Sequence, residues 1–354
     1  MRLFPKDRDL SRGTDEVELR VRASDFQARA DDFEIRLDVF LARYLSWRSR
    51  SSVQGLIREG RIAVDAATPD HPTGSGAFLP ERRPGRRLHH GSRVLIVIPE
   101  HLRLAATVET SEELVVLYED ESAIAVDKPP MLAVHPSGRH LTDTLIQRVH
   151  AAYRSEELHR DARPRLCHRL DRETSGIVLI GKDPEAHADL MRQFERRRVE
   201  KEYLAIVRGS PPADAGVVDL PLGPARASSI RLKMAVVADG LESRTEWNVV
   251  QRHADCTLMA CRPHTGRQHQ IRVHMDAIGH PLVGDKLYGL DEQLFQRAAD
   301  GALSPLDLER LELPRQALHN HLLSFTSPRS GARVRVESPL AADLEHFLAE
   351  RAIR

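Results

Sequence analysis

Long apolar runs and abundant cysteine are both missing from this sequence. No stretch of about 18 apolar residues occurs, so we expect no membrane-spanning helix. The N-terminal residues mix both signs of charge without an apolar core, which excludes a secretory signal. The three cysteines, Cys167, Cys256 and Cys261, cannot all pair, and their spacing matches no zinc motif. We therefore expect free thiols in a reducing cytoplasm and no bound metal.

A net charge of either sign is also missing, since 52 Lys and Arg residues balance 52 Asp and Glu residues. Nucleic-acid-binding proteins are often basic, but phosphate contacts are local, so the distribution of charge matters more than its sum. Residues 33–100 carry 11 basic and 7 acidic side chains, a net charge of +4. The rest of the chain is net acidic, which makes this small region the expected electrostatic foothold for a polyanion.

The chain of 354 residues is long enough for two domains, and its 41% hydrophobic and 29% charged content fits a soluble globular protein. Residues 1–32 show no clean periodicity, which predicts a flexible N-terminal arm. Apolar residues then recur at helical spacing in two short segments, over 37–45 and 53–57. Gly60 is placed to end the second helix.

Two short strands complete the predicted N-terminal domain, which we place at residues 33–100. Ile62 to Val64 alternates as a strand does, and Val94 to Ile98 indicates another. Residues 68–91, between them, are rich in Pro, Gly, Arg and His and indicate a loop insertion. On charge alone, the clustered arginines of this region fit either a solvated helical face or an RNA-binding surface.

The string RLDVFLARYLSWRSRSSVQGLIREGRIAVD (36–65) resembles the α-L RNA-binding module named after a small-subunit ribosomal protein. The resemblance implies that Arg43, Arg50 and Arg58, on the two helices, contact RNA. The usual Asn-Gly turn after the first strand is replaced here by residues 65–67, ahead of the insertion.

Beyond residue 100 the pattern mixes strands and helices, and we assign 101–354 to one α+β domain. The expected fold is a mixed, largely antiparallel sheet flanked by helices. The segments 114–118, 123–126, 177–180, 203–207 and 256–261 are strand-like.

Helix signals follow the strands in this half of the chain. Asp183 and Pro184 begin a helix, as N-cap and first helical residue. The segment 265–268 has the spacing of a capping box, before a helix that Gly279 ends. Residues 290–312 suggest an acidic linker.

Four strings in this half carry the chemistry: DKPPMLAVHP (127–136), CHRLDRETSGIVLIGK (167–182), KEYLAIVRG (201–209) and RPHTGRQHQIRVHMDAIGHPLVGDKLYG (262–289). Together they resemble the RluA-type pseudouridine synthases, a family of RNA uridine isomerases, over residues 112–327. The resemblance implies breaking the bond between ribose carbon 1′ and base nitrogen 1 and rejoining the ring through carbon 5. Because nothing is oxidised or hydrolysed, we expect no cofactor.

The resemblance also implies roles for three residues. Asp171 matches the nucleophile, and covalent catalysis by a carboxylate divides a hard step into easier ones. Arg272 matches the residue that pairs with it, since a nearby cation lowers a carboxyl pKa that burial raises. Tyr203 matches the family tyrosine that stacks on the base and is a candidate for removing the carbon 5 proton.

The remaining site residues are expected to contact RNA. Arg169 matches the residue that fills the gap left by the extruded base, although a phosphate clamp or salt bridge fits it nearly as well. Arg267 and His269 are expected to line the site, and Lys201 to support the tyrosine strand or contact phosphate. His168 fits a hydrogen-bonded structural histidine better than a catalyst.

Three residues depart from the family pattern: Met131 replaces a common glycine, Gln268 a frequent threonine and Asn320 a usual alanine. The domain pairing resembles family members that act on large-subunit ribosomal RNA, which is our expected substrate. A transfer-RNA synthase and a non-catalytic RNA-binding assembly factor remain alternatives. A metal-dependent hydrolase is excluded because no ligand-spaced cluster recurs. We expect a cytoplasmic monomer that binds RNA and no membrane.

Overall fold

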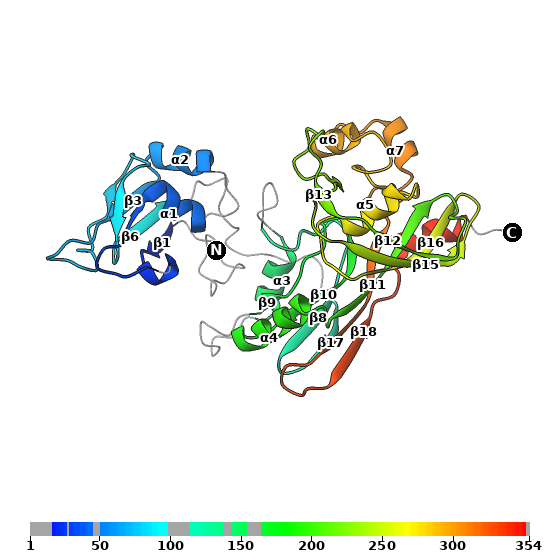
Figure 1. Cartoon of the computed structure of the whole chain (residues 1–354), viewed down its shortest axis with the longest axis horizontal. Coiled ribbons are helices and arrows are strands. Elements are labelled where there is room, and N and C mark those ends of the chain that lie inside the picture. Colours follow the sequence, from blue (N-terminus) through cyan, green and yellow to red (C-terminus); the bar gives the residue numbers. More distant parts are fainter. Residues whose placement is uncertain are drawn as a thin grey trace. The chain divides into compact units, whose positions relative to one another are not determined.

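The computed structural model describes residues 16–26, 28–44, 50–97, 114–136, 143–153 and 164–351. The chain divides into two compact units, one of residues 1–111 with 135–161 and the other of residues 112–134 with 162–354 (Figure 1). The predicted boundary at residue 100 lies outside the described residues. A single boundary cannot represent this division, because a later segment, with helix α3 (Leu145–Ala152), belongs to the first unit.

The first unit is built on a four-stranded antiparallel sheet of order β1-β6-β3-β4. Its elements are β1 (Glu16–Arg20), the 3-10 turn η1 (Ala23–Phe26), β2 (Glu34–Arg36), α1 (Leu37–Tyr44), α2 (Arg50–Arg58), β3 (Ile62–Asp65), β4 (Leu79–Pro80), β5 (Arg87–His89) and β6 (Arg93–Val97). The two helices and the strands predicted at 62–64 and 94–98 are therefore confirmed as elements of this unit.

The predicted flexible arm is wrong for residues 16–26, because this segment adds a strand to the sheet. β1 pairs with β6 over five positions, from Glu16 opposite Val97 to Arg20 opposite Arg93. Leu19 and Val21 are buried in the same core as the apolar faces of α1 and α2. The segment is too short for its alternation of apolar and polar residues to predict a strand. Its partner strand, β6, lies more than 70 residues later in the chain.

The insertion at 68–91 is not a plain loop, since β4 and β5 form in it. The buried carboxylate of Asp65 accepts hydrogen bonds from the backbone N–H groups of Ser75 and Gly76, both at 2.9 Å. Leu88 of β5 is fully buried in the domain core. The residue that replaces the usual turn therefore anchors the insertion.

The second unit contains a ten-stranded sheet of order β12-β15-β16-β11-β17-β10-β8-β7, with β18 on β17 and β9 on β10. Its strands are β7 (Val116–Glu119), β8 (Ala123–Lys128), β9 (Arg165–Leu166), β10 (Ser175–Gly181), β11 (Glu200–Arg208), β12 (Ala215–Asp219), β15 (Arg244–Arg252), β16 (Cys256–Pro263), β17 (Leu318–Thr326) and β18 (Arg333–Glu337); β13 (Leu222–Pro224) and β14 (Met234–Val236) form a separate hairpin. Among the described strands, β10 and β17 run parallel and the other paired strands run antiparallel. The predicted mixed, largely antiparallel α+β fold is confirmed.

Alternating side chains bury both faces of this sheet. On β11, Ala205 and Val207 pack with Ile271 and Met275 of α5 (Gln270–Ala277). The intervening Ile206 packs on the opposite face, with α8 (Ala342–Ala349). The helix α4 (Pro184–Glu195) covers the part of the sheet formed by β8, β10 and β17 (Figure 1). Helix packing thus fixes β10, β11 and α5, the elements that carry the chemical motifs.

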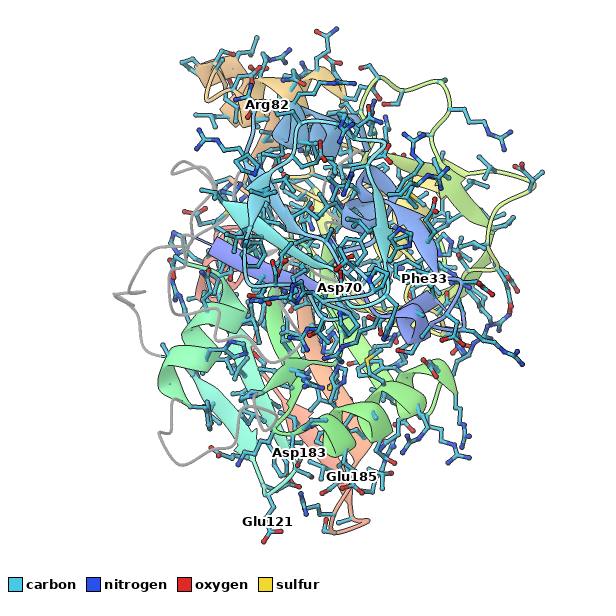
Figure 2. All side chains as sticks on the ribbon, turned by 90° about the vertical axis from the view of Figure 1, so that its left-hand side faces the viewer. Phe33, Asp70, Arg82, Glu121, Asp183 and Glu185 are labelled. Carbon is cyan, nitrogen blue, oxygen red and sulfur yellow. The ribbon has the colours of Figure 1, made fainter. Side chains whose placement is uncertain are left out.

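Local hydrogen bonds fix two of the predicted element boundaries. The Asp183 carboxylate caps α4 by accepting from the N–H groups of Glu185 and Ala186, both at 2.9 Å (Figure 2). In the β7–β8 turn, Asp120 accepts from the N–H groups of Ser122 and Ala123 at 2.7 Å. The predicted start of α4 is confirmed, and the turn joins the strands predicted at 114–118 and 123–126.

The predicted acidic linker at 290–312 is wrong, because two helices form there, α6 (Gln293–Ala299) and α7 (Pro305–Leu311). Ser304 and Asp307 form a capping box at the start of α7, and Arg297 of α6 pairs with Asp307 at 2.8 Å. The ion pair between Arg297 and Asp307 thus links α6 to α7. Among the described residues, none of the helices has the length and apolar composition that a membrane span requires.

Candidate active site

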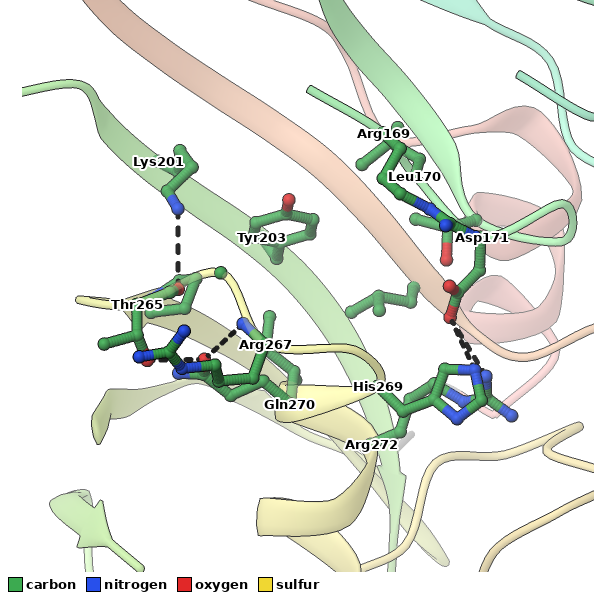
Figure 3. A pocket seen from close by; sticks show the side chains of 15 residues that line it. Arg169, Leu170, Asp171, Lys201, Tyr203, Thr265, Arg267, His269, Gln270 and Arg272 are labelled. Atoms are coloured by element: carbon green, nitrogen blue, oxygen red, sulfur yellow. Dashed lines mark hydrogen bonds and ion pairs between the residues drawn. The ribbon is translucent and has the colours of Figure 1, made fainter. Parts of the chain in front are cut away.

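Four distant segments of the second unit surround an open pocket with about 520 Å³ of empty space (Figure 3). They are the loop that leads into β10, the first half of β11, the segment from the end of β16 to the first turn of α5, and the start of β17. The pocket is lined by Arg169, Leu170, Asp171, Thr174, Lys201, Tyr203, Pro263, Thr265, Gly266, Arg267, His269, Gln270, Ile271, Arg272 and Leu318. Seven of the residues predicted from sequence thus meet around one hollow.

Asp171 lies in the loop before β10, and its side chain is 26% exposed, toward the pocket. Its Oδ2 atom accepts hydrogen bonds from Arg272 Nη1 at 2.9 Å and Gln316 Nε2 at 3.3 Å. Burial would raise the pKa of this carboxyl, but Arg272, together with His269 and Gln316, holds the pKa below its usual value. The result is an ionised carboxylate that faces the pocket, as nucleophilic attack requires.

Arg272 is held on its other side by Asp285. The guanidinium donates from Nε and Nη2 to the two oxygens of this fully buried carboxylate, at 2.7 and 2.9 Å. Asp285 also accepts from the N–H groups of Leu287 and Tyr288. Burial alone would lower the pKa of Arg272, but the two carboxylates raise it. Such a bidentate pair fixes the orientation of the fork, so that Nη1 points at Asp171.

Tyr203 projects from β11 into the pocket and is half-buried. Burial and the charge of Asp171 raise the pKa of its phenol well above the usual value, so the hydroxyl is protonated at neutral pH. The ring is therefore suited to stacking on a base. Its role as acceptor of the carbon 5 proton stays a prediction.

His269 lies beside Asp171, with its Nε2 atom 3.9 Å from Asp171 Oδ2. Its Nδ1 atom is hydrogen-bonded to the hydroxyl of Tyr288 at 2.9 Å, and that hydroxyl accepts from Met234 N–H. Burial lowers the pKa of His269 to about 4. The imidazole is therefore neutral at neutral pH and oriented by Tyr288.

The predicted capping box at 265–268 is wrong, because the helix begins at Gln270. The Gln270 amide oxygen instead accepts from Thr265 Oγ1 at 2.6 Å and from Arg267 N–H at 3.1 Å. His269 has a left-handed backbone with φ of 57°. The side chain of Gln270, the first residue of the helix, thus makes the hydrogen bonds to the preceding loop that the predicted capping box would have made.

Buried charges behind the pocket fasten the Asp171 loop. The fully buried Lys128 ammonium donates to the carbonyl oxygens of Pro129, Leu132 and Arg172, at 2.8 to 3.1 Å. Glu173 pairs with Lys286 at 2.9 Å and accepts from the N–H of Gln316. The two residues that follow Asp171 are therefore held by partners from other segments, which preorganises its carboxylate.

The other predicted contacts fall in three places. Arg169, Lys201 and Arg267 line the pocket (Figure 3). His168 lies behind it, where Nε2 accepts from Leu179 N–H at 2.9 Å. Burial lowers the pKa of this imidazole to about 3, as fits a structural acceptor.

The predicted RNA-contacting arginines of the first unit are on its two helices, Arg43 on α1 and Arg50 and Arg58 on α2. Arg58 is exposed, and its Nη2 atom donates to Gln54 at 3.5 Å. The side chains of Arg43 and Arg50 lie outside the described residues.

The site also contains three residues that no sequence pattern indicated: Asp285, Gln316 and Lys128. Asp285 belongs to the same string as Arg272, and a buried arginine needs a second acceptor, so this partner could have been found. Nothing local marks Gln316, because it reaches Asp171 only through the parallel pairing of β17 with β10.

The structure gives a physical context for two of the departures from the family pattern, Met131 and Asn320. Met131 has a φ of 65°, a left-handed backbone that favours glycine. Asn320 donates from Nδ2 to the carbonyl of Ile177 at 2.7 Å, where β17 meets β10. A Cβ atom on Gly176 would approach the Asn320 carbonyl oxygen to 2.3 Å, so glycine is needed for this crossing. Gln268 donates to the carbonyl of Leu232 and is exposed.

Among the described residues, no group of three or more His, Cys, Asp or Glu side chains is arranged to hold a metal ion. Residues 122–277 match the family model of RNA pseudouridylate synthases, and residues 35–66 match that of the S4 domain. The S4 match lies in the predicted RNA-binding module and the other match includes Asp171, Tyr203 and Arg272.

Whole-chain relatives agree with these matches. The chain is 32% identical to an RNA pseudouridine synthase of Bacillus subtilis over 87% of this chain and 91% of that protein. It is 35% identical to ribosomal large subunit pseudouridine synthase D of Nitrosomonas europaea, over 89% and 83% of the two chains. A solved structure, human RNA pseudouridylate synthase domain containing 1, is 25% identical with a TM-score of 0.53, over 67% of this chain and 89% of that one. The chain therefore belongs to the RNA pseudouridine synthase family of isomerases and carries an N-terminal S4 domain.

Proposed function

We propose that this enzyme isomerises specific uridines in large-subunit ribosomal RNA and that Asp171 is its nucleophile. The observation that carries the proposal is the pocket-facing Asp171 carboxylate, paired with Arg272 at 2.9 Å and held ionised by it. A carboxylate with this environment can form and release a covalent bond to the nucleotide.

The chemistry conserves every atom of the uridine. The bond between ribose carbon 1′ and nitrogen 1 breaks, a bond from carbon 1′ to carbon 5 forms, carbon 5 loses a proton and nitrogen 1 gains one. Asp171 supplies an electron pair for the transient covalent bond and recovers it when the product is released. Arg272 stabilises the carboxylate before attack and after release.

The other pocket residues are proposed to receive an extruded uracil. The ring of Tyr203 stacks on the base, and Arg169, exposed above Asp171, occupies the gap that the base leaves in the RNA (Figure 3). Arg267 and His269 line the same hollow. A planar guanidinium suits the gap because it can stack and also pair with phosphate.

The choice of RNA rests on the domain pairing and on the relatives. The relatives from Nitrosomonas europaea and Pseudomonas aeruginosa, 35% and 36% identical to this chain, are both named as ribosomal large subunit synthases. We place residues 33–100 as the RNA-anchoring domain, with Arg43, Arg50 and Arg58 contacting phosphates, and residues 101–354 as the catalytic domain. We also propose that the enzyme acts in the cytoplasm as a monomer, since residues of one chain complete the pocket.

Mapping pseudouridine across total RNA from cells with and without this protein tests the substrate. The expected result is the loss of one or a few pseudouridines from large-subunit ribosomal RNA, restored by the wild-type gene but not by Asp171→Asn. Loss confined to transfer RNA would contradict the substrate, and an unchanged map would contradict the proposed activity.

A further inference from the structure

A second hollow adjoins the candidate active site and has no role in the proposal above. It holds about 1060 Å³ of empty space open to solvent. The end of α4, the start of β11 and the loop after β16 form its walls. Six residues line both hollows: Arg169, Lys201, Tyr203, Thr265, Gly266 and Arg267. The two hollows therefore share a wall. Figure 3 labels the side chains of Arg169, Lys201, Tyr203, Thr265 and Arg267 in this wall.

Three cationic side chains, Arg169, Lys201 and Arg267, line the shared wall, and the carboxylate of Glu195 lines the second hollow beyond it. Lys201 is half-buried, and within the described part of the chain its Nζ atom donates only to the carbonyl oxygen of Thr265, at 3.5 Å. Arg267 donates from Nε to the carbonyl oxygen of Glu242. Among the described residues, no carboxylate lies within ion-pair distance of Lys201, Arg267 or Arg169. A half-buried ammonium without a counter-ion favours an anionic ligand, because burial alone disfavours its charged form.

An aromatic side chain lines the second hollow outside the shared wall. Phe194, near the end of α4, is half-buried, and its ring packs on His168 with 5.0 Å between centroids. The exposed side chains of Arg197 and His264 line the same hollow, where Arg197 pairs with Glu242 at 3.2 Å and His264 lies 2.9 Å from Glu246. Aromatic rings beside cations are the usual platform for an unstacked RNA base.

We propose that the second hollow binds the nucleotide directly next to the target uridine, with its base against Phe194 and the linking phosphate at Lys201 and Arg267. The inference rests on the proposed function, since the target uracil occupies the first hollow. The shared wall then lies where the backbone must pass from one base to the next. The site thus recognises an extruded dinucleotide step rather than a single base.

A binding cycle tests the proposal separately from catalysis. The probe is a nine-nucleotide single-stranded RNA with one central uridine among adenosines, compared with two RNAs lacking the base on the 5′ or the 3′ side of the uridine. The full-length protein and its Phe194→Leu variant, which keeps an apolar side chain at the position, are titrated with all three. We expect the wild-type protein to bind one of the two RNAs that lack a base about tenfold more weakly than the intact RNA. The Phe194→Leu variant should bind that RNA and the intact RNA with equal affinity.

The same design tests the phosphate contact. Lys201→Met should weaken binding of the unmodified RNA. A neutral methylphosphonate at the linkage between the uridine and the base that contacts Phe194 should not lower the RNA affinity of this variant any further. If Phe194→Leu weakens all three RNAs equally, or wild type binds them equally, the base-binding role is wrong. The pseudouridine map decides the proposed function independently, because binding coupling needs no turnover.

Discussion

The double role of Arg272 leads to a prediction about pH that one substitution alone cannot test. Arg272→Met removes the cation from two carboxylates, Asp171 and the fully buried Asp285. Leaving a buried charge without its partner typically costs about 3–5 kcal/mol of unfolding free energy. The single variant should therefore be strongly destabilised, for reasons that have little to do with catalysis.

The double variant Arg272→Met, Asp285→Asn separates stability from catalysis. The asparagine oxygen can still accept from the N–H groups of Leu287 and Tyr288, and the buried charge is gone. We expect most of the lost unfolding free energy to return. In the double variant Asp171 lacks its cation, so burial raises its pKa with only His269 and Gln316 to oppose it.

The measurements are urea unfolding and the pH profile of carbon 5 hydrogen release from labelled RNA. Because protonated Asp171 cannot attack, activity of the double variant should fail at a higher pH than activity of wild type. Asp285→Asn alone is the control, since it keeps the contact between Arg272 and Asp171 and should not move the acidic limb upward. If the double variant is as stable as wild type and loses activity at the same low pH as wild type, the proposed effect of Arg272 on the pKa of Asp171 is wrong.

Three further predictions follow from particular side chains. Five hydrogen-bond donors hold the pKa of Asp120 at about 2 despite burial, so Asp120→Asn should cost roughly 2 kcal/mol of unfolding free energy at pH 7. This stabilisation is fully present above the unfolded value of 3.8 and is lost as pH falls toward 2, so urea unfolding at pH 3 should show a smaller difference, and a constant one would count against it. Tyr203→Phe should keep the RNA affinity that Tyr203→Leu loses, because stacking needs the ring, and equal losses in a filter-binding assay would argue otherwise. Arg58→Gln should reduce the slope of log affinity against log salt by roughly 0.7–0.9, whereas Arg87→Gln, whose arginine pairs with Glu34 at 3.0 Å, is the control and should leave the slope unchanged.

Local patterns sufficed where a residue's own neighbours decide its structure. Asp183 before Pro184 predicted the start of α4, and alternating apolar residues predicted the buried strand at 177–180. The family resemblance brought Asp171, Tyr203 and Arg272 together before any geometry was known. Their meeting in one pocket agrees with it.

Sequence patterns failed where a distant segment completes the structure. The strand β1 is stable only because β6 pairs with it, and the buried apolar side chains that mark it are Leu19 and Val21. Gln316 reaches Asp171 through a parallel pairing that spans more than 140 residues. In the segment 290–312, counting charges concealed the capping box of Ser304 and Asp307.

The central claim is that the Asp171 carboxylate is the nucleophile, and Asp171→Asn tests it most directly. An amide is nearly isosteric but far less nucleophilic, and the lost negative charge cannot weaken attraction to phosphate. Hydrogen release from carbon 5 of labelled uridine in RNA is measured beside RNA affinity, with Asp214→Asn, an exposed aspartate outside the pocket, as control. The account predicts no release by Asp171→Asn, unchanged affinity and a fully active control. Substantial release by the Asp171→Asn enzyme would contradict it.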